Sequence, residues 1–438
     1  MSAPATTRTP LPEGTAPVGA ALLIAGVATY AFFKVGTWAV GGAAEFKPIS
    51  SLWFATFALA PGFFLPLEQE IGRALSHRRA IGQGGRPVLA KIVRLAVVLV
   101  TIVLLAILAV SPLVAAEYFD GDWVMLVALM VAFAAYAPAI IARGICSGSG
   151  RFTDYAIVMG SDGVVRITLC VALAVAGVTA AGAYGFAVAL APLVGLALVM
   201  QRGGLRTAEG PEATWKEVTP NLGWLLLGSV FAASLLNAGP IATELLAKPE
   251  QDAEVTQFAY GVLLARIPLF MFQAVQAALL PRLSRLAARG ELAEFRAGLK
   301  RLLIVVLGVG VVGTLGALVL GPFVIDIVYG ADLSGRTLAM LALGSACYMV
   351  ALSLAQAVIA LKGHAYVAIG WIIGVAAFAL GTWLSSDDLF RRVEIGLFVS
   401  SAAAMVTFAV VLRQRLADGI VPDADSMMDA ITDMPLET

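Results

Sequence analysis

The stretch from Asn221 to Ala247 reads NLGWLLLGSVFAASLLNAGPIATELLA and holds one ionisable side chain, Glu244. A helix needs about 20 mainly apolar residues to cross the hydrocarbon core of a bilayer. Such runs recur along the whole chain, in which 60% of the residues are hydrophobic and 13% are charged. A soluble domain carries about 25% charged residues. The composition therefore predicts an integral membrane protein and excludes a water-soluble globular fold.

Runs of this kind predict about twelve spanning helices. In the first half they are Val18–Gly42, Ser50–Glu70, Ala90–Ala115, Trp123–Arg143, Tyr155–Val178 and Gly182–Gln201. In the second half they are Leu222–Ala247, Phe258–Leu280, Leu302–Tyr329, Thr337–Leu361, Val367–Ser385 and Glu394–Leu412. The expected fold class is all-α integral membrane, with a six-helix lobe at 1–201, a linker at 202–219, a second six-helix lobe at 220–413 and a disordered acidic tail at 414–438.

A coarse internal duplication supports the division into two lobes. The second run of each half is followed by a basic segment, LEQEIGRALSHRR at 67–79 and AALLPRLSRLAAR at 277–289. Leu75-Ser76 and Leu283-Ser284 then correspond at a spacing of 208 residues. Repeated halves of this kind are typical of transporters whose substrate site lies between the repeats.

The short loops predict the orientation, because cytoplasmic loops collect lysine and arginine. With the N-terminus inside, the cytoplasmic segments hold 20 of the 29 basic residues, and the outer loops hold five, Lys47, Lys248, Arg336, Arg391 and Arg392. We therefore expect a multi-pass protein of the plasma membrane with both termini in the cytoplasm.

Several function classes are disfavoured by what the sequence lacks. The net charge is zero, which gives no reason to expect a nucleic-acid partner. Three scattered cysteines and two histidines predict neither a disulfide framework nor a metal site. The nucleotide-binding pattern GxxxxGK[ST] is absent, and the outer loops are too short for a catalytic domain. We expect no enzyme activity, no cofactor and no metal.

An ionisable residue within a spanning helix costs about 2.5–3.5 kcal/mol on insertion scales, so its position is informative. Lys34 lies in the outer half of the first run, and Tyr30 and Thr37 share its helical face. This polar stripe favours a water-filled cavity for an anionic substrate group. The alternative is a lysine that extends outward to the lipid headgroups.

Arg266 lies near the middle of the eighth run, beside Pro268, with Gln273 almost on the same face. Arginine binds phosphate oxygens with two parallel hydrogen bonds and stays charged. Arg266 is therefore a candidate diphosphate contact, with Gln273 beside it. The alternative is a structural ion pair with Glu244 or Glu68.

The remaining intramembrane charges allow more than one interpretation. Asp162 and Arg166 are spaced for an intrahelical ion pair, which we interpret as structural. Glu68 and Glu70 end the second run near the cytoplasm, where they either couple transport to a proton or cation or are simply solvated.

The seventh run carries Asn237, Pro240 and Glu244 over two turns. Proline frees a backbone carbonyl, which is tolerated in a membrane only where it faces protein or water. We therefore place this helix beside the cavity, with Asn237 as a substrate contact and Glu244 as a further candidate for ion coupling.

Three segments resemble polysaccharide-biosynthesis flippases of actinobacteria, in the multidrug/oligosaccharidyl-lipid/polysaccharide (MOP) exporter superfamily. They are AYGVLLARIPLFMFQAVQAALLPRLSRLAARGELAEFRAGLKR (259–301), RGICSGSGRFTDYAIVMGSDGVVRI (143–167) and the opening stretch 221–247. The resemblance extends over most of the chain. The resemblance to the fourteen-helix lipid II flippases is weaker, because we find no counterpart of their two further C-terminal helices. The resemblance to the exporter superfamily implies a MATE-like fold with alternating access of two lobes, and a central cavity lined by the first, second, seventh and eighth helices.

The substrate that this resemblance implies is a polyprenyl-diphosphate-linked oligosaccharide, moved from the inner to the outer leaflet. Its partners would be that lipid, the surrounding membrane and polysaccharide assembly enzymes. Two alternatives stay open: a MATE-like antiporter for small molecules and cations, which an anionic cavity around Glu68, Glu70 and Glu244 would favour, and a scaffold in a cell-envelope complex that transports nothing.

Overall fold

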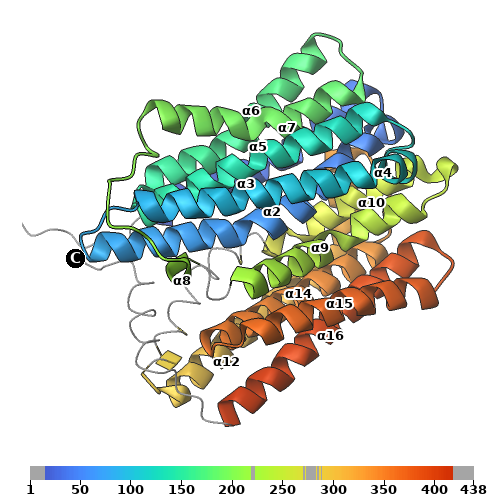
Figure 1. The fold of residues 1–438 in the computed structure, drawn as a ribbon. Helices are drawn as coiled ribbons and strands as arrows, with labels where there is room; N and C mark the ends of the chain where they lie inside the picture. The colour runs from blue at the N-terminus through green and yellow to red at the C-terminus, as the bar shows by residue number, and fades with distance from the viewer. Residues whose placement is uncertain are drawn as a thin grey trace, which may run out of the picture.

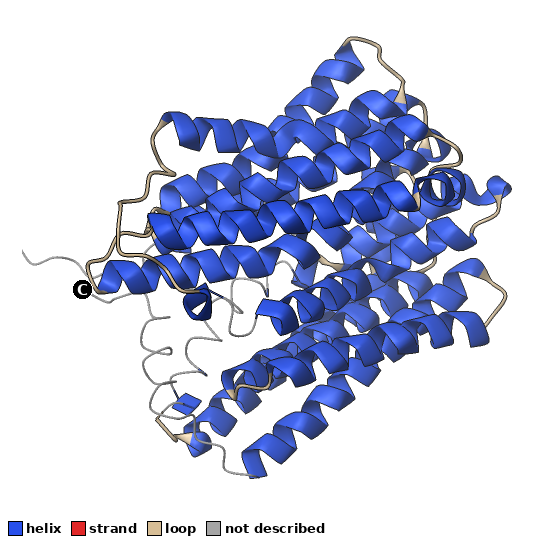
Figure 2. Ribbon diagram, in the orientation of Figure 1, coloured by secondary structure: helices blue, strands red, loops and turns tan. Residues whose placement is uncertain are grey.

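The computed structural model describes residues 15–218, 222–269 and 289–417, together with Phe272, Leu283, Leu286 and Ala287. Within these residues every regular element is a helix (Figure 2). Eleven of the described helices are long and apolar enough to cross a membrane. The expected span at Phe258–Leu280 lies only partly within the described residues. The all-α membrane fold predicted from the sequence is confirmed.

The helices of the first half are α1 (Thr15–Val40), α2 (Ala43–Ala80), α3 (Arg86–Ala109), α4 (Ser111–Tyr118), α5 (Trp123–Gly148), α6 (Phe152–Val175) and α7 (Ala181–Gln201). The connection to the second half carries α8 (Trp215–Val218), which packs against α2 and α3. The second half has α9 (Leu222–Leu246), the 3₁₀ turn η1 (Pro249–Gln251), α10 (Asp252–Ala265), α12 (Leu292–Val319), α13 (Gly321–Tyr329), α14 (Gly335–Ala360), α15 (His364–Leu384) and α16 (Leu389–Ala417). The tail beyond Ala417 lies outside the described residues.

The helices pack mainly within their own half. In the first half α1 packs on α6, α2 on α5, and both α5 and α6 on α7; in the second half α12 and α15 flank the central pair α14 and α16. Figure 1 shows the blue-to-green helices as one group and the orange-to-red helices as another, with α9 between them. The two groups meet where α2 contacts α9 and α10. We call this contact the seam.

Small residues bring the two halves together at the centre of the seam. A Cβ atom on Gly62 of α2 would lie 2.9 Å from the Cα atom of Val230 in α9, so the two backbones are in direct contact. The Ser229 hydroxyl donates to the Pro61 carbonyl at 3.5 Å nearby. Lipid tails are as apolar as leucine side chains, so helices associate in a membrane through close packing of this kind and through hydrogen bonds.

Two expected helices are divided in the structure, and proline explains both divisions. The expected run Ala90–Ala115 breaks after Ala109, and Leu302–Tyr329 breaks after Val319. Each short helix that follows, α4 or α13, has proline among its first two residues. Proline is tolerated in a first helical turn but interrupts a helix interior. The corresponding breaks in the two halves strengthen the internal duplication seen in the sequence.

The second helix is much longer than the run Ser50–Glu70 that predicted it. At 1.5 Å per residue, the 38 residues of α2 span about 57 Å, roughly twice the hydrocarbon thickness of about 30 Å. The helix therefore extends beyond the apolar layer at both ends. Lys47 lies near its first end, and Arg78 and Arg79 lie at the other.

Candidate functional site

An interruption in α10 positions Arg266 at the seam. The helix ends at Ala265, Arg266 adopts a turn, and a further helical turn follows at 267–269. Pro268 lacks a backbone N–H and its ring crowds the carbonyl four residues earlier, so the helix cannot continue regularly. Interrupted helices commonly form the substrate sites of secondary transporters.

The guanidinium of Arg266 is buried against α9 and α2, and the residue is 5% exposed. Its Nη1 donates to the Oδ1 atom of Asn237 at 3.0 Å, and its Nη2 donates to the Leu236 carbonyl. The ring of Phe54 lies 5.4 Å from the guanidinium carbon. Asn237 is itself fixed, because its Nδ2 donates to the Ala233 and Phe57 carbonyls at 2.9 and 3.3 Å. The sequence predicted both residues as substrate contacts, and the structure brings them together.

Every partner of Arg266 among the described residues is neutral. No carboxylate of the described residues forms an ion pair with it: Glu244 pairs with Lys47, and Glu68 pairs with Arg143. Tyr30 lies near, since its hydroxyl donates to the carbonyl of Leu263, one helical turn before Arg266, at 2.7 Å. The seam therefore contains a buried positive charge that the described residues leave uncompensated.

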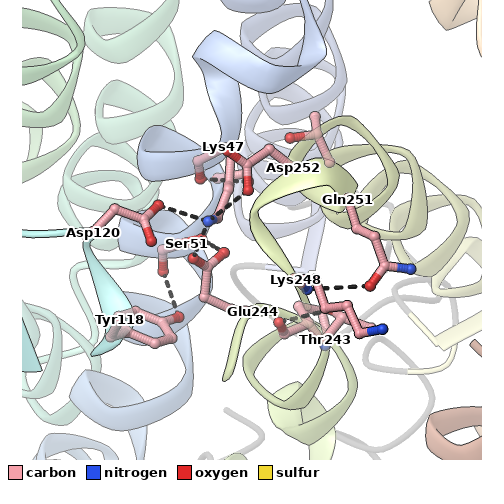
Figure 3. Close-up of polar contacts among 12 residues, drawn as sticks. Lys47, Ser51, Tyr118, Asp120, Thr243, Glu244, Lys248, Gln251 and Asp252 are labelled. Carbon is pink, nitrogen blue, oxygen red and sulfur yellow. Dashed lines mark hydrogen bonds and ion pairs between the residues drawn. The ribbon is translucent and has the colours of Figure 1, made fainter. Parts of the chain in front are cut away.

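A second polar group closes one end of the seam (Figure 3). Lys47 of α2 is 5% exposed, and its Nζ lies 2.6 Å from Asp120, 2.9 Å from Asp252 and 3.2 Å from Glu244. The Ser51 hydroxyl also donates to Glu244. We call these five residues the Lys47 cluster.

The Lys47 cluster joins the two halves. Lys47 and Asp120 belong to the first half, whereas Glu244 lies in the last turn of α9 and Asp252 begins α10 in the second. Two further bonds cross at the same end, from Thr256 to the Ala43 carbonyl at 2.6 Å and between the hydroxyls of Thr37 and Tyr260 at 2.5 Å. The seam is therefore tied by hydrogen bonds and ion pairs at the end that the basic loops predict to be outside.

The carboxylates considered for ion coupling are all buried and paired. Glu68 is 2.9 Å from Arg143 and accepts a hydrogen bond of 2.9 Å from Tyr155, and Glu70 is 2.6 Å from Arg73. The alternative that Glu68 and Glu70 are solvated does not describe them, because α2 continues past both to Ala80 and packs them against protein.

Asp162 and Arg166 lie 3.0 Å apart within α6, at the spacing that the sequence suggested for a structural pair. The Tyr136 hydroxyl donates to Asp162 at 3.2 Å, and the Phe57 ring lies 5.2 Å from the Arg166 guanidinium. The pair therefore joins α6 to α5 and α2.

Two further residues were predicted as substrate contacts, Lys34 and Gln273. Lys34 is exposed and lines a separate cavity that does not include Arg266. Gln273 lies outside the described residues. Within the described part of the chain no three His, Cys, Asp or Glu side chains gather as metal ligands.

No pattern in the sequence singled out Lys47 as a functional residue. It lies between two apolar runs and counted as an outer-loop residue, yet α2 begins at Ala43 and includes it. Its partners Asp120 and Asp252 are 73 and 205 residues away in the chain. The sequence feature that could have identified Lys47 is that it is the single basic residue between the first two apolar runs.

Comparison with known proteins gives matches of two kinds. A family model described as lipid II flippase MurJ matches residues 153–343, less than half of the chain. Among individual proteins, the uncharacterised Rv1510 of Mycobacterium tuberculosis (strain ATCC 25618 / H37Rv) is 28% identical over 338 residues, covering 74% of each chain. The uncharacterised Mb3654 of Mycobacterium bovis is 27% identical over 282 residues, covering 61% of this chain and 62% of that one.

Among solved structures, an inward-facing multidrug resistance MATE family transporter of the MOP superfamily superposes with a TM-score of 0.66 at 13% identity. The match covers 89% of this chain and 95% of that one. An outward-facing structure of such a transporter gives a TM-score of 0.63 at 13% identity, over 93% and 97% of the two chains. The expected resemblance is found in both comparisons: this chain has the fold of the MATE transporters, and the family model that matches residues 153–343 is that of a lipid II flippase.

Proposed function

We propose that this chain flips a polyprenyl-diphosphate-linked saccharide from the inner to the outer leaflet by alternating access of its two halves, in the synthesis of a cell-surface polysaccharide. The observation that carries the proposal is the buried, uncompensated charge of Arg266 at the seam. An unpaired charge in a low-dielectric site is costly, so such residues mark ion or substrate pathways in membrane proteins.

The chemistry around Arg266 suits a diphosphate. Its two hydrogen-bonded nitrogens face neutral acceptors, Asn237 and the Leu236 carbonyl, which a phosphate oxygen would outcompete because charge-assisted hydrogen bonds are roughly twice as strong. The prenyl tail needs no protein cover, because it is apolar and can remain in the hydrocarbon of the bilayer. The family match to a lipid II flippase supports a lipid-linked substrate of the same general class.

The acidic residues weaken the alternative of a cation antiporter. Such a transporter needs a carboxylate that is free to receive a cationic substrate or a coupling ion. Glu68, Glu70 and Glu244 are each paired with a basic side chain. Arg266 is buried, has no carboxylate partner among the described residues and is positive, which favours an anionic substrate.

The Lys47 cluster gives the proposed cycle a closed end. Alternating access requires one end of the seam to close while the other admits substrate. Bonds across the seam at the Lys47 end must break before a head group can leave there. The proposed motion is a rocking of the two halves about the connection at 202–219, driven by an ion gradient or by the membrane potential.

The test is a flipping assay in liposomes with a fluorescent polyprenyl-diphosphate oligosaccharide. We expect Arg266→Ala to slow flipping at least roughly tenfold, because a hydrogen bond to a charged group contributes about 1.5–3 kcal/mol. The matched control is Arg202→Ala, which removes an exposed arginine far from the seam along the chain. Equal rates for native protein and folded Arg266→Ala would refute the role of Arg266. A native protein that moves no lipid-linked saccharide would refute the function itself.

A further inference from the structure

An apolar groove lies between α12 and α16, at the end of the molecule that the basic loops predict to be cytoplasmic (Figure 1). Both helices pack on α14, which forms the floor of the groove, and its volume is about 370 Å³. The lining is apolar except for two exposed arginines and consists of Arg296, Leu354, Ala409, Leu412, Arg413, Leu416 and Ala417. Arg296 of α12 reaches across to α16, because its Nη2 donates to the Leu416 carbonyl at 3.0 Å.

The helix ends around this groove are positively charged. The start of α12 and the end of α16 carry five basic residues and one acidic residue, namely Arg296, Lys300, Arg301, Arg413, Arg415 and Glu294. None of the five basic side chains forms an ion pair with a described residue. The groove therefore combines an apolar floor with a rim of cations that lack acidic partners in the described part of the chain.

The segment 418–438 follows the last residue of the groove, Ala417, and carries the opposite charge. It has no lysine or arginine and six acidic residues, Asp418, Asp423, Asp425, Asp429, Asp433 and Glu437. The residues 418–422 connect Ala417 to Asp423 over at most about 20 Å when extended. The acidic residues that follow are therefore held close to the two arginines of the groove.

The sequence between Pro422 and Pro435 has the period of a helix with one apolar face. In a helical conformation that face would consist of Ala424, Met427, Met428, Ile431 and Met434. The adjoining face would carry Asp425, Asp429 and Asp433. Peptides that bind in apolar grooves use anchors at this spacing, and methionine adapts to irregular apolar surfaces because its side chain is flexible.

From these features we infer that the segment 423–434 docks in the α12–α16 groove of its own chain. Its methionine face covers the floor at Leu354 and Leu412, and its aspartates pair with Arg296 and Arg413. A lipid phosphate has the same charge as these aspartates but is not tethered beside the groove. A short tether gives an effective concentration of about 1 mM, so a contact with a dissociation constant of about 0.1 mM would be occupied roughly nine-tenths of the time. The docking does not depend on the transport of any substrate.

Double electron–electron resonance on the full chain in phosphatidylcholine nanodiscs tests the inference. Spin labels are placed at Ala297→Cys, which is exposed on α12 beside the groove, and at Ser426→Cys, in a background in which the three native cysteines are replaced. We expect a narrow distance peak. Arg296→Glu with Arg413→Glu should weaken docking about tenfold and broaden the peak, because attraction becomes repulsion at two positions. Adding Asp425→Arg with Asp429→Arg should restore the narrow peak.

The matched control is Arg202→Glu with Arg206→Glu, which reverses two exposed arginines of the connection between the halves and should leave the peak unchanged. Met427→Asp with Met428→Asp alters the segment alone, so the groove stays intact, and it should broaden the peak. The inference is overturned if the chain without these substitutions gives a distribution as broad as the charge-reversed variant. A narrow peak that survives both the charge reversal and the methionine substitutions would also overturn it. So would loss of the peak in phosphatidylglycerol nanodiscs, because a lipid headgroup would then occupy the groove.

Discussion

Replacing Lys47 should open the end of the seam that the Lys47 cluster closes. In Lys47→Gln the carboxylate of Glu244, with a side chain 1% exposed, stays buried without its cation. Removing one partner of a buried ion pair costs about 3–5 kcal/mol. Opening this end hydrates Glu244 and removes most of that cost, so the variant destabilises the closed state selectively.

The burial of each partner of Lys47 determines how far the ratio of open to closed states changes in Lys47→Gln. Asp120 is 60% exposed and Asp252 is 34% exposed, so their pairs with Lys47 contribute only about 0–1 kcal/mol each. The Glu244 pair dominates, and 3–5 kcal/mol corresponds to a change of roughly a hundredfold to several thousandfold in the ratio of open to closed states. If the closed state of the native chain is a few kcal/mol more stable than the open state, the variant would be mainly open.

Double electron–electron resonance measures this shift. Spin labels at Glu117 in α4 and Glu250 in η1 are exposed, lie on opposite halves and flank the Lys47 cluster, in a background in which the three native cysteines are replaced. We expect the distance distribution of Lys47→Gln to gain a longer component. The matched control Asp120→Asn removes a partner from the same half as Lys47 and should leave the distribution unchanged.

A second substitution sharpens the test. Adding Glu244→Gln to Lys47→Gln removes the unpaired buried charge, so the double variant should return toward the closed distribution. If Lys47→Gln leaves the distance distribution as it is in the native chain, the Lys47 cluster does not hold the seam, and the reasoning from burial is wrong.

Two further predictions concern the packing that supports the site. Gly62→Leu should lower the melting temperature of the purified protein, since a side chain there would collide with the backbone at Val230, whereas Gly308→Leu has open space and should not. Arg143→Ala should destabilise the fold by about 3–5 kcal/mol by leaving Glu68 buried and unpaired, and adding Glu68→Gln should recover part of the loss in the same melting assay.

The sequence predicted the parts of the site that depend on a single helix. Pro268 indicated a weakened helix, and α10 does end just before Arg266. Hydropathy placed Asn237 and Arg266 in spans, and the family resemblance assigned those spans to the cavity. The structure adds the contact between them at 3.0 Å. A local pattern can show which residues are unusual within a helix, because that depends only on helical geometry.

Partners across the seam could not be predicted in this way. The ion pairs of Lys47 depend on how α2, α9 and α10 pack, and no period in one helix encodes the position of another. The sequence left open whether Glu68 and Glu70 couple transport to an ion or are solvated, because the apolar run ends with them. The helix continues and buries them beside Arg143 and Arg73. Hydropathy locates the lipid-facing length of a helix and misses the part that is buried by protein beyond it.

The short helices α4 and α13 occupy corresponding positions in the two halves, yet the edges of the seam beside them differ. Each follows a long apolar helix, begins near a proline and ends in a tyrosine that lies over the second helix of its own half. In the first half Tyr118 bonds to Ser51, and the adjoining edge is tied by ion pairs. In the second half the buried Tyr329 hydroxyl has no hydrogen-bond partner among the described residues, and the adjoining edge is a cavity lined by Lys34, Thr37 and Trp38. If the halves rock apart as proposed, a lipid-linked head group that leaves Arg266 on the α2–α9 side can do so only after the bonds of Lys47 break.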